Sequence, residues 1–192
     1  MATPLVVFVH GWSVQHTRTY GGLPARLQQA AEADGLQIDV AHLYLGEYIS
    51  FRDEVRVEDI AHAFDAALRS VLQRAGRRRA VCITHSTGGP AVREWLARFH
   101  AGAAAARCPI SHLVMLAPAN FGSALAQLGK ARVGRLKAAF AGVEPGQRVL
   151  DWLELGSAEA WRLNHDAIHA AGAAAGPWAF VLCGDAIDRK LY

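Results

Sequence analysis

Five short apolar runs, separated by helical segments, constrain the fold of this chain more than any other feature. The runs lie at residues 5–10, 38–44, 80–85, 111–117 and 178–183. Each run is apolar nearly throughout, without polar alternation, which is typical of strands covered on both faces of a parallel sheet. The alternation with helices therefore predicts an α/β fold, a doubly wound three-layer sandwich with a mainly parallel sheet.

Two helical segments connect the first three predicted strands. The first, at residues 23–34, is only weakly amphipathic. The second has a continuous apolar stripe at helical spacing, and Gly76 marks its end. The stripe consists of Ile60, Phe64, Ala67, Leu68, Val71, Leu72 and Ala75.

The stretch from about 119 to 176 differs from the rest of the chain. It has helical patterns around 121–128, 147–154 and 157–170 but no strand, and it is too long for a simple connection. It predicts a lid-like helical insertion above the sheet, and hence a candidate wall of a substrate pocket. Its large apolar residues either line an acyl pocket or, more commonly for such residues, belong to the core. They are Trp152, Leu153, Leu155 and Trp161.

Composition indicates a single globular domain over residues 1–192. Hydrophobic residues make up 52% of the chain and the formal net charge is +3. The one basic run, Arg77–Arg79, lies at a predicted helix exit, so we expect no nucleic-acid partner. The three cysteines lack paired spacing and predict neither disulfides nor a zinc site.

The chain enters its first strand almost immediately, and no apolar run is long enough to cross a bilayer. We therefore expect no signal peptide, no transmembrane segment and a cytoplasmic location. The oligomeric state is not predicted.

Ser86 lies between the third predicted strand and a helical pattern, in the run HSTGG of residues 85–89. Strand, tight turn with a serine, and helix together predict a nucleophile elbow, which holds the serine Oγ at the carboxyl end of the sheet. Such a turn forces the serine into a sparsely allowed conformation, and small neighbours relieve the crowding. Gly88 is expected to do this, whereas Thr84 stands where the G-x-S-x-G pattern has its first glycine. The alternative is an ordinary serine that caps the helix.

A nucleophilic serine needs a base for its proton and donors for the oxyanion. The backbone N–H of Thr87, at a helix N-terminus, is one predicted donor. The other is the N–H of Trp12, in the loop that follows the first strand. We expect His10 to support this loop and His85 to pack beside the elbow, and neither to act as the base.

Three sequence blocks carry a resemblance to a known family. Residues 10–12 (HGW), 84–89 (THSTGG) and 115–123 (MLAPANFGS) lie in this order at the ends of three predicted strands. Together they resemble the α/β-hydrolase superfamily, on its lipase and esterase side, over nearly the whole chain. The resemblance implies the α/β-hydrolase fold and a Ser-acid-His triad with Ser86 as nucleophile. It also implies cleavage of small-molecule or lipid carboxylic esters through an acyl-enzyme, without a cofactor.

The acid and histidine of such a triad are harder to place. Asp188, with Asp185 as the alternative, follows the last predicted strand, which is one position of the acid in this family. No histidine follows that strand, because the last one, His169, precedes it. We therefore expect the domain to be truncated at its C-terminus, and the 192 residues alone to hydrolyse esters weakly or not at all.

Two alternatives stay open. The chain could be a catalytically inactive α/β-hydrolase-like binding protein, or an incomplete fragment that lacks the triad histidine. Separately, His165 and His169 are four residues apart on a predicted helix, a spacing that suits zinc. Because no third ligand is apparent, we predict a surface helix and no metal site there.

Overall fold

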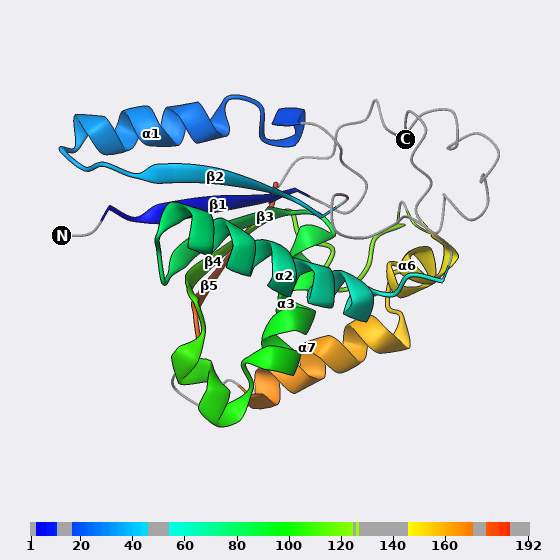
Figure 1. Ribbon diagram of the computed structural model, residues 1–192. Coiled ribbons are helices and arrows are strands. Elements are labelled where there is room, and N and C mark those ends of the chain that lie inside the picture. Colours follow the sequence, from blue (N-terminus) through cyan, green and yellow to red (C-terminus); the bar gives the residue numbers. More distant parts are fainter. Residues whose placement is uncertain are drawn as a thin grey trace.

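The computed structural model describes residues 3–10, 17–45, 54–124, 126, 146–170 and 176–184. Within these residues the strands form one parallel sheet in the order β2-β1-β3-β4-β5 (Figure 1). The strands are β1 (Leu5–His10), β2 (Asp39–Tyr44), β3 (Ala80–His85), β4 (Ile110–Leu116) and β5 (Trp178–Leu182). All five predicted strands are thus confirmed.

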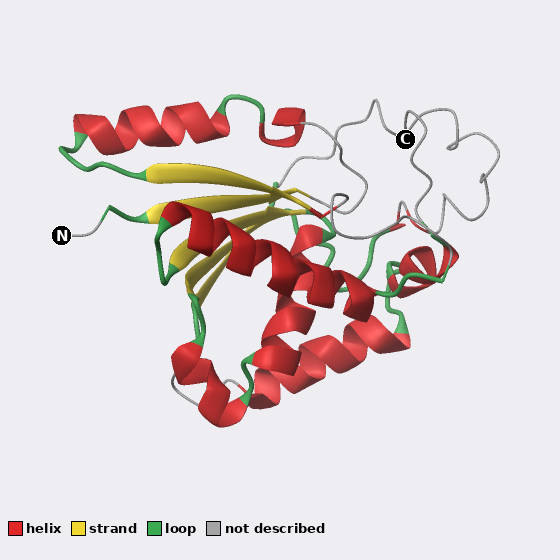
Figure 2. Ribbon diagram, viewed as in Figure 1, coloured by secondary structure: helices red, strands yellow, loops and turns green. Residues whose placement is uncertain are grey.

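The helices cover both faces of the sheet, as Figure 2 shows. Helix α1 lies on one side, and α2, α3 and α7 lie on the other. The predicted three-layer α/β sandwich is therefore confirmed. The helical elements are η1 (Thr17–Tyr20), α1 (Leu23–Ala33), α2 (Val57–Ala75), α3 (Gly88–Phe99), η3 (Gly102–Arg107), α6 (Gln147–Trp152) and α7 (Ala158–Ala170).

Two of the three helices predicted between 119 and 176 are confirmed as α6 and α7. The predicted helix at 121–128 falls largely outside the described residues. Helix α7 packs against α3, so it belongs to the helical layer on that face of the sheet. The insertion thus contributes a structural helix of the sandwich.

Helix α2 has clear local signals at both ends. The Asp59 carboxylate accepts a hydrogen bond from the Arg56 N–H at 2.8 Å, which satisfies one free donor of the first turn. Gly76, with a φ of +62°, ends the helix in a left-handed conformation, as predicted. The predicted apolar stripe faces the core, where Phe64 and Ala67 are completely buried.

Successive residues of β1 point to opposite faces of the sheet. Val7 joins the main core with α2 and α3, whereas Phe8 packs on the other face against Tyr20. The Tyr20 hydroxyl donates hydrogen bonds to the main-chain oxygens of Val9 and Ile83. This tyrosine therefore ties η1 to the carboxyl ends of β1 and β3, the two strands that lead into the predicted site.

The outer strand β5 is exposed along its whole length. Trp178 is 72% exposed, and Phe180, Val181 and Leu182 are each about half exposed. Described residues therefore leave both faces of this apolar strand uncovered. None of the described helices has the length and apolar character needed to cross a bilayer.

Candidate active site

The turn between β3 and α3 has the backbone geometry of a nucleophile elbow. Ser86 directly follows β3 and has a φ of +52°, a left-handed conformation that costs a non-glycine residue about 1–3 kcal/mol. Helix α3 begins two residues later, at Gly88. Ser86 is half-buried, and no described side chain hydrogen-bonds to its Oγ. The strained turn that the sequence predicts is therefore present.

Main-chain hydrogen bonds to the segment after β4 hold this turn. The Ser86 N–H donates to the Leu116 oxygen at 3.2 Å. The Ser86 oxygen accepts from the N–H groups of Ala119 and Gly89, both at 3.2 Å. Ala117, between them in the segment, is the other described non-glycine residue with a positive φ, at +42°. Two strained residues thus lie at the ends of adjacent strands.

The position at the elbow that has no room for a side chain is Gly89. The expectation that Gly88 relieves the crowding is therefore wrong. A Cβ atom added at Gly88 would lie 3.5 Å from the Thr84 Cβ, an ordinary contact. A Cβ atom at Gly89 would lie 2.7 Å from the Pro118 Cβ, closer than real Cβ contacts allow. The limiting neighbour is a proline from the next strand-loop unit, which the elbow pattern itself does not reveal. Thr84 is completely buried, and its Oγ1 has no hydrogen-bond partner among the described residues.

The predicted donor Thr87 lies at the edge of the sheet where β1, the strand before Trp12 in the sequence, also ends. Val9 of β1 lies opposite Thr84 of β3, so β1 ends at His10 level with the start of the elbow. Thr87 is the N-cap residue of α3, where the helix dipole favours negative charge. Trp12 lies outside the described residues, so its part in an oxyanion hole stays a prediction.

A cluster of rings on the α1 side of this edge was not predicted from the sequence. His10 is completely buried, its Nε2 lies 3.0 Å from the His42 Nδ1, and its ring stacks on Tyr44 with centroids 4.3 Å apart. Burial, together with His42, lowers the pKa of His10 to about 4. Burial also lowers the pKa of His85, whose ring faces Tyr20 at a centroid distance of 6.4 Å. The alternation of His42 and Tyr44 along β2 is the signal that could have revealed the cluster.

Among the described residues no acid or base side chain hydrogen-bonds to Ser86. Asp185 and Asp188 lie outside them, and β5, which precedes both, is two strands away from β3 in the sheet. His165 and His169 lie together on α7, with ring centroids 4.2 Å apart. Among the described residues no group of three potential ligands could hold a metal ion. The triad partners of Ser86 therefore stay predictions.

The third sequence block forms a tight joint between the elbow and the insertion. We call residues 117–122 the post-β4 segment. A Cβ atom at Gly122, where φ is +86°, would lie 2.2 Å from the Glu154 oxygen. The next residue, Ser123, donates its N–H to the Leu153 oxygen at 2.7 Å. Only glycine allows the two main chains to approach this closely.

The large apolar residues of the insertion divide into two pairs. Trp152 and Leu153 are buried in the main core, whereas Leu155 and Trp161 are more than half exposed. A pocket of about 810 Å³ lies between α3, α7 and β5, and neither these four residues nor Ser86 line it. The core assignment therefore holds for the first pair, and this pocket is separate from the elbow.

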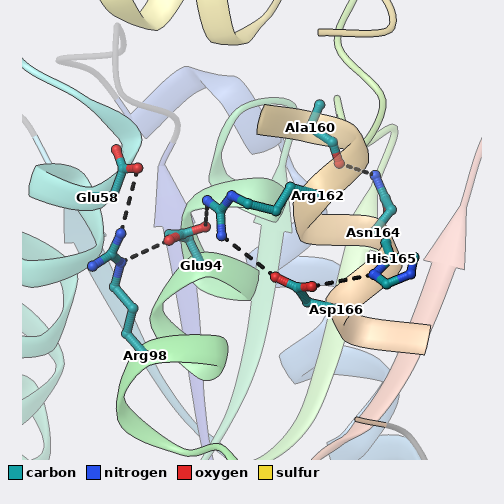
Figure 3. A network of polar contacts seen from close by, with 8 residues as sticks. All are labelled: Glu58, Glu94, Arg98, Ala160, Arg162, Asn164, His165 and Asp166. Atoms are coloured by element: carbon teal, nitrogen blue, oxygen red, sulfur yellow. Dashed lines mark hydrogen bonds and ion pairs between the residues drawn. The ribbon is translucent and has the colours of Figure 1, made fainter. Parts of the chain in front are cut away.

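Charged side chains join α7 to the other helices of its layer (Figure 3). Glu94 of α3 is 2% exposed and pairs with Arg98 at 2.7 Å and with Arg162 of α7 at 3.5 Å. Arg98 also reaches Glu58 of α2 at 3.5 Å. The network thus links three helices around one buried carboxylate.

Comparisons with known proteins agree with this architecture. No family model and no curated protein matches the chain. Among solved structures, the chain is similar to phospholipase PlaB from Legionella pneumophila, with 53% identity and a TM-score of 0.82 over 100% of this chain and 41% of that one. The same phospholipase in complex with thio-NAD matches with 52% identity and a TM-score of 0.79, over 99% and 40% of the two chains. The mature lipase BlEst2 from Bacillus licheniformis shares the fold at 20% identity and a TM-score of 0.64, over 100% and 69%.

The chain spans about two fifths of the length of the phospholipase that it matches. Its parallel sheet between two helical layers, with a strained serine turn after β3, agrees with the resemblance carried by the three sequence blocks. The chain has the α/β-hydrolase fold and resembles the bacterial lipases and esterases within it.

Proposed function

We propose that this chain carries the nucleophile of a serine hydrolase of the lipase and esterase type, which cleaves carboxylic esters of lipids. The observation that carries the proposal is Ser86, half-buried and strained at the carboxyl edge of the sheet, with its main chain tied to the neighbouring strand end. A protein named as a phospholipase and 53% identical to this chain supports a lipid ester as substrate. Because only 41% of that protein is matched, the activity of the whole belongs to the proposal.

The proposed reaction has two halves. Ser86 Oγ attacks the ester carbonyl carbon while its proton passes to a histidine base, and the N–H groups of Thr87 and Trp12 hold the oxyanion. The bond to the alcohol oxygen then breaks, and the alcohol leaves with that proton. Water next attacks the acyl-enzyme with help from the same base and releases the carboxylic acid. Each oxyanion donor contributes about 3–4 kcal/mol to such a reaction.

The remaining triad members lie outside the described residues. Asp188, or Asp185 in its place, would orient the histidine after β5. No hydrogen bond between a described histidine and Ser86 is present, and in this proposal the base belongs to polypeptide that the structure does not describe. The oxyanion donors and this acid are parts of the proposal that follow from the family resemblance.

The test compares the full-length protein with its Ser86→Ala variant. We expect hydrolysis of phosphatidylcholine vesicles and of a p-nitrophenyl ester, lowered roughly 10⁴-fold or more by the substitution. A fluorophosphonate should label Ser86, as located by mass spectrometry of the peptides. Ser70→Ala, on α2 and remote from the elbow, is the matched control and should leave turnover unchanged.

Equal turnover by the wild-type and Ser86→Ala proteins would refute the assignment. Vesicle binding without any turnover, unaffected by Ser86→Ala, would instead identify a binding protein that has kept the hydrolase fold.

A further inference from the structure

Three of the four hydrogen-bonding positions of the Asn164 amide are used, including both N–H donors. Asn164 lies on α7 and is 6% exposed, beside the buried residues Ala160 and Leu163. Its Nδ2 donates to the Asn120 oxygen at 2.6 Å and to the Ala160 oxygen at 2.8 Å. Its Oδ1 accepts from the Arg93 guanidinium at 2.7 Å. Because carbonyls face one side of the amide and a cation faces the other, only one orientation satisfies all three contacts.

Joining α7 to α3 does not by itself require this asparagine. Asparagine is a poor helix former, and a buried amide is costly unless it is paired. The neighbouring pair of Glu94 and Arg162 already joins the same two helices (Figure 3). What Asn164 adds is a bond to the main chain of Asn120, which lies 44 residues away in the sequence.

That bond reaches the elbow through the post-β4 segment. Asn120 follows Ala119, whose N–H donates to the Ser86 oxygen at 3.2 Å. At the start of the segment, the Ala117 N–H donates to the Leu182 oxygen at 2.7 Å. A strained backbone persists only where its surroundings hold it. These bonds fix the post-β4 segment on both sides of Ala119, the residue that contacts the elbow.

We propose that Asn164 is a positioning residue for Ser86. It fixes the post-β4 segment against the elbow and so keeps the serine hydroxyl in its reactive orientation, while Arg93 fixes the orientation of the Asn164 amide. The inference rests on the proposed function, because it requires Ser86 to be the nucleophile. It assigns a task in catalysis to α7, a helix with no residue next to the serine in the described contacts.

Asn164→Asp in the full-length protein separates this role from helix packing. Aspartate has the same shape and keeps an oxygen for Arg93, but it replaces the Nδ2 donor with an oxygen that faces two carbonyls. If Asn164 served only to join α7 to α3, the new charge pair with Arg93 would preserve activity. Asn164→Ala removes both functions, and Arg93→Met removes only the group that orients the amide. Arg162→Met is the matched control, since it breaks the neighbouring α3–α7 contact without touching the post-β4 segment.

The readouts are the second-order rate of fluorophosphonate labelling at Ser86, kcat and KM for the ester, and the melting temperature. We expect Asn164→Asp and Asn164→Ala to lower the labelling rate and kcat at least tenfold, with KM changed less than threefold. Arg93→Met should lower both rates about threefold, and Arg162→Met less than twofold. A labelling rate equal to that of the wild-type protein in Asn164→Asp or in Arg93→Met would overturn the inference. So would a loss of labelling rate in Arg162→Met as large as that in Asn164→Asp, if the two variants have the same melting temperature. Absence of labelling and turnover in the wild-type protein would instead mean that the proposed function itself is wrong.

Discussion

At the scale of single residues, the strain of the site is concentrated in Ser86 and Ala117, with φ values of +52° and +42°. Each costs roughly 1–3 kcal/mol. The hydrogen bonds of the sheet continue through both residues, because the Ser86 N–H donates to the Leu116 oxygen and the Ala117 N–H donates to the Leu182 oxygen. The strained turns are therefore extensions of the strand ladder, and these bonds offset part of their cost.

His10 makes the stability of the fold depend on pH. Its pKa is about 4 in the folded chain, against 6.5 in an unfolded one, because burial and His42 disfavour the charged imidazole. Between these two values the unfolded chain binds more protons, so the free energy of unfolding falls as the pH falls from 6.5 towards 4. We expect a loss of about 1 kcal/mol from this group between pH 7.5 and pH 5.5, measured by urea unfolding.

His10→Phe provides the comparison, because it keeps a ring beside Tyr20 and Tyr44 but cannot bind a proton. The pH dependence of unfolding should be smaller in this variant by about the same amount. An identical slope in both proteins would show that His10 is not kept neutral by the fold.

At the scale of elements, the post-β4 segment links the sheet to the insertion through one close contact of main chains. Gly122 meets the Glu154 oxygen where a Cβ atom would lie only 2.2 Å away. Since both partners are backbone, neither can move aside without shifting the start of α7 or the end of β4. The joint therefore connects the main chain between α6 and α7 directly to the segment that follows β4.

Gly122→Ala should destabilise the chain by about 3 kcal/mol or more, because the new methyl group clashes with backbone and φ is positive. Gly156→Ala is the matched control. Gly156 has a similar φ of +77°, but a Cβ there would meet only the Trp161 Nε1 at an ordinary 3.5 Å. It should cost about 1–2 kcal/mol, the strain alone. Equal losses in denaturant unfolding of the two variants would show that the joint has room for a side chain.

Elements with a local pattern could be predicted from the sequence, whereas contacts between distant elements could not. The apolar runs predicted all five strands, and the serine turn predicted the positive φ of Ser86. No local pattern marks Glu94 as buried, and its partner Arg162 lies far away in the sequence, in the insertion. Asn164 donates a hydrogen bond to the main-chain oxygen of Asn120. Since every residue has such an oxygen, the sequence at position 120 does not indicate this contact. The hydrophobic periodicity of a helix or strand indicates which of its faces is buried, but it does not indicate which other element packs against that face.

At the scale of the whole molecule, β5 is the most exposed strand of the described sheet. All five of its residues are exposed, including Trp178 and Phe180, and its outer edge has no strand partner among the described residues. Uncovered apolar edge strands favour pairing with other chains. The 192 residues alone are therefore expected to associate through this strand.

Phe180→Lys should reduce that association, because a charge on an edge strand disfavours pairing. Size-exclusion chromatography with light scattering of the 192-residue chain measures the change. Leu36→Lys is the control, since Leu36 is 61% exposed but lies away from β5. A wild-type chain that stays monomeric at the highest attainable concentration would contradict the expectation.

The position of β3 in the middle of the described sheet has a practical use. The main chain of Ser86 hydrogen-bonds to Leu116 and Ala119, so these bonds form only when β4 has docked on β3. A covalent probe of this hydroxyl is therefore also a folding reporter. During refolding, uptake of the probe would date the docking of β4 on β3, independently of any substrate.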